Sequence, residues 1–156
     1  MPSITIREYN PESGALLGNV SVLNFGRITA GTSSTVKVFD IAFTEVTQVG
    51  NIKLGLISSG GLTVNSNPID VTSDGSASNG QFGIESSATF DAAKASSPLS
   101  RHFAGRNSDS TAANSNNVSV DNRNSTTSDY IYLDIQVDAS TTDAVNGAYK
   151  VFFDYA

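Results

Sequence analysis

His102 is the only histidine in the chain, so any catalysis with an imidazole base would depend on it. Ser100 lies two residues before it, but the chain has no G-x-S-x-G turn, the turn that exposes the nucleophile of many serine hydrolases. The chain contains no cysteine, which excludes thiolate nucleophiles, disulfides and thiolate metal sites. Carboxylates that a glycosidase would need in pairs stand on separate predicted turns and strand ends: Glu8, Glu12, Glu45 and Glu85. We therefore expect a protein that is not an enzyme and that holds no cofactor.

Two loops offer the oxygen ligands that calcium prefers. One contains Asp70 and Asp74, and the other contains Asp109, Asn114, Asn116 and Asp121. Neither has the ligand spacing of an EF-hand loop. Asn and Asp in loops more often accept hydrogen bonds from their own backbone turns. We expect turns here, with a calcium site as the alternative.

Arginine and aromatic residues surround His102, and these residue types dominate the energetics of protein interfaces. We predict that this cluster contacts a neighbouring subunit through Arg101, His102, Phe103 and Arg106. We expect three apolar side chains from the same half of the chain to support the contact, namely Phe82, Phe90 and Leu99. The alternative is that Phe103 attaches the loop to its own domain.

Composition limits the possible partners. The formal net charge is -6, and Lys and Arg are scattered with no two adjacent, so we expect no nucleic-acid binding. Charged residues are only 15% of the chain, and Ser, Thr, Asn and Gly replace them, which suits packing against other protein because neutral groups cost less to desolvate. No apolar run approaches 18 residues and no basic region precedes an apolar one at the N-terminus. We expect no membrane contact and synthesis in the cytoplasm without a signal peptide.

Alternating apolar residues and Gly-containing turns predict an all-β chain. We predict strands over residues 3–9, 19–25, 34–43, 51–57, 62–64, 81–85, 118–120, 129–137 and 148–155, with a helical turn over 90–95. The Asn146-Gly147 pair predicts a hairpin that joins the last two of these strands. The spacing favours one domain over residues 1–156, an antiparallel β-sandwich of immunoglobulin-like or jelly-roll type. A long loop-rich insertion, at about residues 65–128, is rich in Ser, Thr, Asn and Asp, and we expect neighbouring subunits to order it.

Two segments carry a family resemblance. The first is the turn Phe25-Gly26 to Ser34, of the form FG-x-x-x-x-G-x-x-S, followed by the strand VKVFDIAF. The second is the ending, with YIYLDIQV, a Gly-containing turn and YKVFFDYA. Both resemble immunoglobulin-like domains of phage structural proteins. The resemblance implies a virion component, either a capsid decoration (cement) protein or a tail or baseplate part, that forms homo-oligomers and contacts other virion proteins such as the major capsid protein.

Tyrosines near the C-terminus suggest an alternative function. Carbohydrate-binding β-sandwiches present aromatic rings on one face, and the chain has Tyr130, Tyr132, Tyr149 and Tyr155 in its last two predicted strands. Tyr130 and Tyr132 share one face of their strand, opposite Ile131 and Leu133. A carbohydrate-binding or host-adhesion module is therefore the second hypothesis. Carbohydrate binding requires a groove in which these rings are exposed. Exposed tyrosines alone do not identify such a site, because they serve protein contacts equally well.

Overall fold

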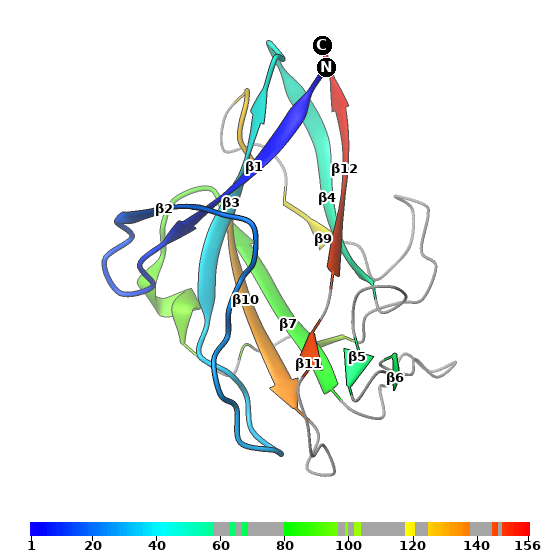
Figure 1. The fold of residues 1–156 in the computed structure, drawn as a ribbon. Helices are drawn as coiled ribbons and strands as arrows, with labels where there is room; N and C mark the ends of the chain where they lie inside the picture. The colour runs from blue at the N-terminus through cyan, green and yellow to red at the C-terminus, as the bar shows by residue number, and fades with distance from the viewer. Residues whose placement is uncertain are drawn as a thin grey trace.

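The computed structural model describes residues 1–57, 63–64, 67–68, 80–96, 99, 102–103, 118–120, 125–137, 145–146 and 148–156. These residues form antiparallel sheets, with one short 3₁₀ turn at Ala92–Ala95. The chain is therefore all-β in its described part, as the sequence predicts (Figure 1).

The largest sheet has six strands in the order β2-β1-β3-β10-β7-β8. In chain order their bounds are β1 Ser3–Tyr9, β2 Leu16–Val20, β3 Lys37–Thr44, β7 Gly80–Ser87, β8 His102–Phe103 and β10 Tyr130–Val137. A three-stranded sheet has the order β12-β4-β9, with bounds β4 Val49–Ile57, β9 Val118–Ser119 and β12 Ala148–Tyr155. A further small sheet has the order β11-β5-β6, with bounds β5 Thr63–Val64, β6 Asn67–Pro68 and β11 Val145–Asn146.

The main core lies between the six-stranded sheet and the β12-β4-β9 sheet. Alternate residues of the central strands contribute to it, because successive side chains of a strand point to opposite faces. The buried side chains are Phe39, Ile41 and Phe43 of β3, Ile131, Leu133 and Ile135 of β10, and Ile52 and Leu54 of β4. The rings of Phe43 and Phe153 lie 4.7 Å apart between centroids and join β3 to β12.

A second cluster lies on the opposite face of the six-stranded sheet. It contains Tyr9, Val38 and Tyr132, together with Val36 and Leu99, all buried. Both faces of the central strands β3 and β10 are therefore covered. This explains why the β3 sequence KVFDIAFT is apolar on both sides.

The turn between β1 and β2 is built as its sequence predicts. The Asn10 side-chain oxygen accepts hydrogen bonds from the backbone N–H groups of Glu12 at 2.9 Å and Ser13 at 3.1 Å. Gly14 ends the turn with φ of +73°, a left-handed conformation that glycine adopts without steric cost.

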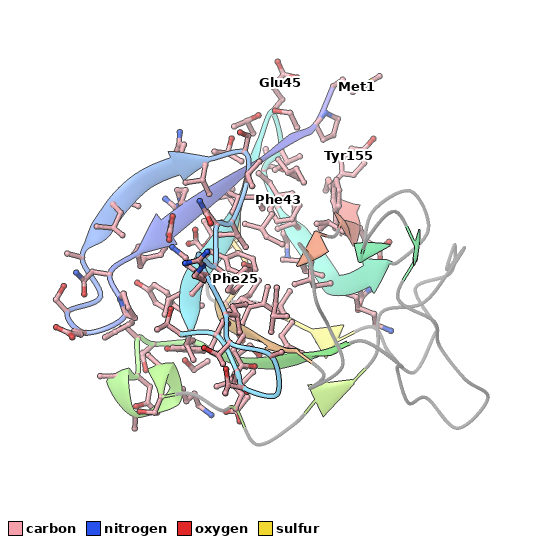
Figure 2. All side chains as sticks on the ribbon, turned by 60° about the horizontal axis from the view of Figure 1, so that its bottom comes forward. Met1, Phe25, Phe43, Glu45 and Tyr155 are labelled. Carbon is pink, nitrogen blue, oxygen red and sulfur yellow. The ribbon has the colours of Figure 1, made fainter. Side chains whose placement is uncertain are left out.

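The predicted strand over residues 19–25 is wrong in its bounds. The strand ends at Val20, and residues 21–36 form an irregular segment in which Leu23, Phe25 and Ile28 pack against the main core (Figure 2). The alternation in this stretch reflects this packing and does not come from a sheet ladder. An irregular segment brings these three side chains to the core, while Val22, just before them, remains 73% exposed.

The predicted hairpin between the last two long strands is also wrong. β10 pairs with β3 on one side and β7 on the other, whereas β12 pairs with β4 in the other sheet. The Asn146-Gly147 pair favours a tight turn only in its own stretch of chain. It cannot make β10 pair with β12, because β3 and β7 occupy the two sides of β10. Asn146 instead belongs to β11, which pairs with β5.

Two buried serines supply hydrogen bonds to backbone N–H groups beyond the two ends of the β3–β10 ladder. The Ser128 N–H donates to the Ile41 carbonyl at 2.9 Å, and its Oγ accepts from the Ile41 N–H at 2.9 Å. Ser34 makes the same pair of bonds with Ile135, at 2.8 and 2.9 Å. In both places a hydroxyl oxygen replaces the carbonyl that an extended ladder would supply, which satisfies a buried donor.

We expect Ser128→Ala to lower the free energy of unfolding by about 1–3 kcal/mol, because the buried Ile41 N–H loses its acceptor. Urea unfolding measures the change, and hydrogen exchange at Ile41 should accelerate. The control is Ser3→Ala, which removes an exposed hydroxyl bonded to Thr44 and should change stability by no more than about 0.5 kcal/mol. Equal effects of the two substitutions would show that the Ser128 hydroxyl has no special role.

Both chain ends lie at the turn between β3 and β4 (Figure 1). The Met1 ammonium forms an ion pair with Glu45 at 2.5 Å. The Ala156 carbonyl accepts from the Thr47 N–H at 2.9 Å, and the Ala156 N–H donates to the Gln48 carbonyl at 2.9 Å. Met1, Glu45 and Tyr155 gather at this end of the domain (Figure 2).

Candidate functional site

The structure brings three of the predicted interface residues to one edge of the six-stranded sheet. His102 and Phe103 form the edge strand β8, where Phe103 pairs with Phe82 of β7 and His102 pairs with Gly83. The side chains of Phe82, His102 and Phe103 lie outside the described part of the structure. Arg101 and Arg106 also lie outside it, as do the loop residues considered as calcium ligands.

Phe90 and Leu99 pack on their own domain. Leu99 is only 4% exposed within the second cluster. The Phe90 ring lies 6.1 Å from Tyr130 and 6.5 Å from Tyr132 between centroids. It also rests against Gly14, because a Cβ placed on Gly14 would lie 2.7 Å from the ring. These two side chains pack on the chain's own sheet, so we do not include them in a proposed interface.

The sheet face that these residues cover bears Tyr9, Tyr130 and Tyr132, and we name it the tyrosine face. Tyr9 and Tyr132 are 7% and 0% exposed. The Tyr132 hydroxyl accepts from the Asp91 N–H at 2.8 Å and lies 2.9 Å from the Ser87 hydroxyl. The Tyr9 and Tyr130 rings meet edge to face at 5.0 Å. Of the four tyrosines that suggested sugar stacking, Tyr132 is therefore enclosed by the chain itself and Tyr130 is partly buried, whereas Tyr155 is 59% exposed and the side chain of Tyr149 lies outside the described part.

A buried ion pair lies on the same face. Asp40, which is fully buried, accepts from Arg7 Nε at 2.8 Å and Arg7 Nη2 at 2.5 Å, and from the Tyr9 hydroxyl at 3.1 Å. The hydrogen bond to Asp40 raises the pKa of Arg7 above its ordinary value, so the guanidinium stays charged at every pH where the protein would be studied.

A second buried carboxylate also has a structural partner. Asp134 of β10 accepts from the Leu99 N–H at 3.0 Å, which fixes residue 99 over the tyrosine face. Sequence reasoning did not single out Asp40 or Asp134. The sequence feature that could have indicated these buried carboxylates is an acidic residue at the centre of an otherwise apolar strand, in VFDIAF and YLDIQV.

The carboxylates considered for glycoside cleavage are not brought together. Glu8 of β1 pairs with Lys37 at 2.8 Å, Glu85 of β7 pairs with Lys94 at 3.2 Å, and Glu45 pairs with the N-terminus. Two strands, β3 and β10, separate Glu8 from Glu85 in the sheet. Glu12 is exposed in the β1–β2 turn.

Two other kinds of feature are absent from the described residues. In that part of the chain, no group of three or more His, Cys, Asp or Glu side chains could hold a metal ion. No helix there is long and apolar enough to cross a membrane.

The other edge of the six-stranded sheet carries exposed apolar side chains that sequence reasoning missed. Leu16 and Leu17 of β2 are 56% and 61% exposed, and Val22 just beyond it is 73% exposed. The sequence feature that could have indicated this surface is the absence of any charged residue between Glu12 and Arg27. Exposed leucines on an uncharged sheet edge are typical of a protein contact.

Comparison with known proteins does not assign these surfaces. No protein-family model, no curated protein and no solved structure matches the chain. The function must therefore be inferred from the residues and their geometry.

Proposed function

We propose that this chain is a non-enzymatic structural subunit of a bacteriophage particle, either a capsid decoration (cement) protein or a tail or baseplate component. In this role it joins neighbouring subunits, both copies of itself and other virion proteins. The phage setting rests on the resemblance of its FG-x-x-x-x-G-x-x-S turn and its C-terminal strands to immunoglobulin-like virion domains.

We further propose that the domain is a β-sandwich of immunoglobulin-like or jelly-roll type. Support comes from the main core, in which Ile41 and Leu133 of the six-stranded sheet share one cluster with Ile52 of the three-stranded sheet. Side chains from two sheets that form one core are the defining feature of a sandwich. The contact between Phe43 and Phe153 links the same two sheets.

The observation that carries the structural function is the closure of the tyrosine face. This face has the residue types of a binding site, with tyrosines, two carboxylates and an arginine. These groups instead hold the fold together: Asp40 binds Arg7 and Tyr9, Tyr132 binds the Asp91 N–H, and Asp134 binds the Leu99 N–H. Polar groups used in this way make a domain rigid and specify one arrangement. Such rigidity suits a subunit that acts by holding its loops in place.

The same observation weighs against the carbohydrate-binding alternative. A sugar ring stacks on an exposed aromatic face, and Tyr132 has no exposed surface while Tyr9 has little. Tyr155 is 59% exposed, but it lies at the chain end beside Ala156. Its ring lies 5.9 Å from that of Phe153 between centroids, and an exposed tyrosine of this kind serves a protein contact equally well.

The mechanism we propose is geometric. The rigid sheets present the two sheet edges, β2 and β8, to neighbouring subunits. Each contact alone is weak, but many copies in a closed symmetric shell or ring raise the local concentration, and the summed contacts hold the assembly together.

Mass spectrometry of purified particles tests the proposed function. Phage particles would be isolated by density gradient from the lysate of the cells that make this chain. We expect its peptides in the particle band at a fixed ratio to the major capsid protein, while enzymes of the same lysate stay in the soluble fractions. Recovery of the chain only in the soluble fractions would contradict a structural role in the particle.

A further inference from the structure

The exposed edge strand β2 lacks the charged side chains and prolines that commonly guard a sheet edge. Natural sheet edges are commonly guarded by lysines, prolines or inward-pointing charges. β2 has the sequence LLGNV, and no charged residue or proline occurs from Ser13 to Gly26. Its leucines lie more than half exposed at the end of the sheet, where β2 is hydrogen-bonded to β1.

A β-bulge shapes this edge. Tyr9 pairs with Leu16 and Glu8 pairs with Gly18, so Leu17 is an extra residue in the strand, and Gly18 has φ of +140°. The bulge interrupts the outer row of backbone groups. A long continuous ladder with a partner strand is therefore disfavoured, and a contact here depends mainly on the apolar side chains of Leu16, Leu17 and Val22.

We propose that a second copy of this chain covers this edge, with the two β2 strands antiparallel about a two-fold axis. This inference rests on the proposed function as an assembly subunit and names its partner. The edge is self-complementary, because the exposed leucines at one end can meet the exposed Val22 just beyond the other end of the partner strand. An antiparallel two-fold contact uses the same patch on both copies.

Charge favours a second copy at this place. Two chains that each carry a net charge of -6 repel one another, and self-association is least opposed where no carboxylates face each other. The uncharged stretch from Ser13 to Gly26 provides such a surface. A strongly charged partner would find no opposite charge along this stretch.

The size of the edge predicts a weak contact. Each partner in a stable complex buries roughly 800 Å² from about 20–30 residues, whereas β2 and Val22 offer only a short edge. Pairs of β2 strands should therefore form at high local concentration, as within a particle, and separate in dilute solution.

Disulfide trapping tests the inference, and the chain is suited to it because it contains no cysteine. Four single-cysteine variants would be oxidised at about 1 mM protein, a concentration that populates contacts of millimolar affinity. They are Leu16→Cys, Leu17→Cys, Asn19→Cys and Val22→Cys. The control is Gln48→Cys, which is exposed at the β3–β4 turn. Disulfides form only where two Cα atoms approach within about 7 Å.

We expect one or two adjacent β2 positions to give several-fold more covalent dimer than Gln48→Cys. Adding a lysine at the leucine that the best variant leaves in place, Leu17→Lys or Leu16→Lys, should return the yield to the control level, because each copy would then place a charge against the apolar patch of the other. Equal dimer yields at β2 and at Gln48 would overturn the inference. The proposed function is tested separately, because the chain could be present in particles without β2 pairing, and β2 could pair in a protein that is absent from particles.

Discussion

Asp40→Ala is expected to lower the free energy of unfolding by about 3 kcal/mol, which would make it the most damaging charge substitution in the described part of the chain. Asp40 is fully buried and accepts three hydrogen bonds, two from Arg7 and one from Tyr9. Without the carboxylate, the Arg7 charge loses the group that compensates its partial burial. This loss of about 3 kcal/mol lies at the lower end of the range for breaking a buried ion pair, because 27% of the Arg7 side chain remains exposed to water.

Urea unfolding followed by tyrosine fluorescence measures this effect as a shift of the midpoint at constant slope. Two controls separate the loss of the ion pair from other effects. Lys94→Met breaks the more exposed pair with Glu85 and should cost at most about 1 kcal/mol. The double variant Arg7→Met/Asp40→Leu removes both charges and should recover much of the lost stability, because apolar side chains of similar volume often replace a buried pair without penalty. A double variant as unstable as Asp40→Ala would indicate that packing of Asp40, and not its charge, is what matters.

Gly14→Ala is expected to lower the free energy of unfolding by about 2–4 kcal/mol. Two causes add. A residue with a Cβ is strained at φ of +73°, by about 1 kcal/mol. The new methyl group would also lie 2.7 Å from Cγ and Cδ1 of Phe90, and overpacking of this kind costs about 1–3 kcal/mol.

Gly26→Ala is the matched control for the Gly14 prediction. Gly26 has nearly the same backbone conformation, with φ of +70°, but nothing lies within 4 Å of a Cβ placed there. It should lose only the conformational part, about 1 kcal/mol. Adding Phe90→Leu to Gly14→Ala should relieve the steric part, and a double-mutant cycle then isolates the contact between the turn and the ring. Equal losses at the two glycines would mean that Phe90 moves aside at no cost.

The sequence predicts strands well where alternation and burial agree. The first and last predicted strands have the observed bounds, Ser3–Tyr9 and Ala148–Tyr155, and the long strand near residue 130 begins only one residue later than predicted. In each of these strands one face is apolar over several residues, which specifies both the strand and its inward side. The turn at Asn10–Gly14 is equally predictable because its side-chain cap and its positive φ depend on local residue types.

The errors arise where tertiary packing decides. Leu23 and Phe25 alternate like strand residues, but they reach the core from an irregular segment. Strand pairing is similarly non-local, so the Asn146-Gly147 signal could not reveal that β12 pairs with β4, some hundred residues away in sequence. The serine bonds that join Ser128 to Ile41 depend on where a ladder ends, and no local pattern encodes that position.

The predicted interface itself stays a prediction, and the structure bears only on where some of its residues lie. The sequence placed Tyr130 and Tyr132 correctly on one strand face, but residue types alone could not show that Phe90 and Leu99 pack on that face. The grouping of Phe82 with Phe103 was predicted from composition, and pairing of β7 with β8 places them opposite each other. Leu16 and Leu17 were overlooked because two adjacent leucines show no alternation that would distinguish an exposed pair from a buried one. Their exposure follows from the position of β2 at the sheet edge, which the sequence does not reveal.

The meeting of both chain ends on the β3–β4 turn has a consequence for how the domain can be rebuilt. Met1 bonds to Glu45 and Ala156 bonds to Thr47 and Gln48, so a short linker would connect the ends without crossing a sheet. New ends could then be opened in the exposed turn around Gly31, giving a circular permutant with the same strands in a different chain order. Cargo fused to the first residue and cargo fused to the last would emerge side by side from one tip of the domain.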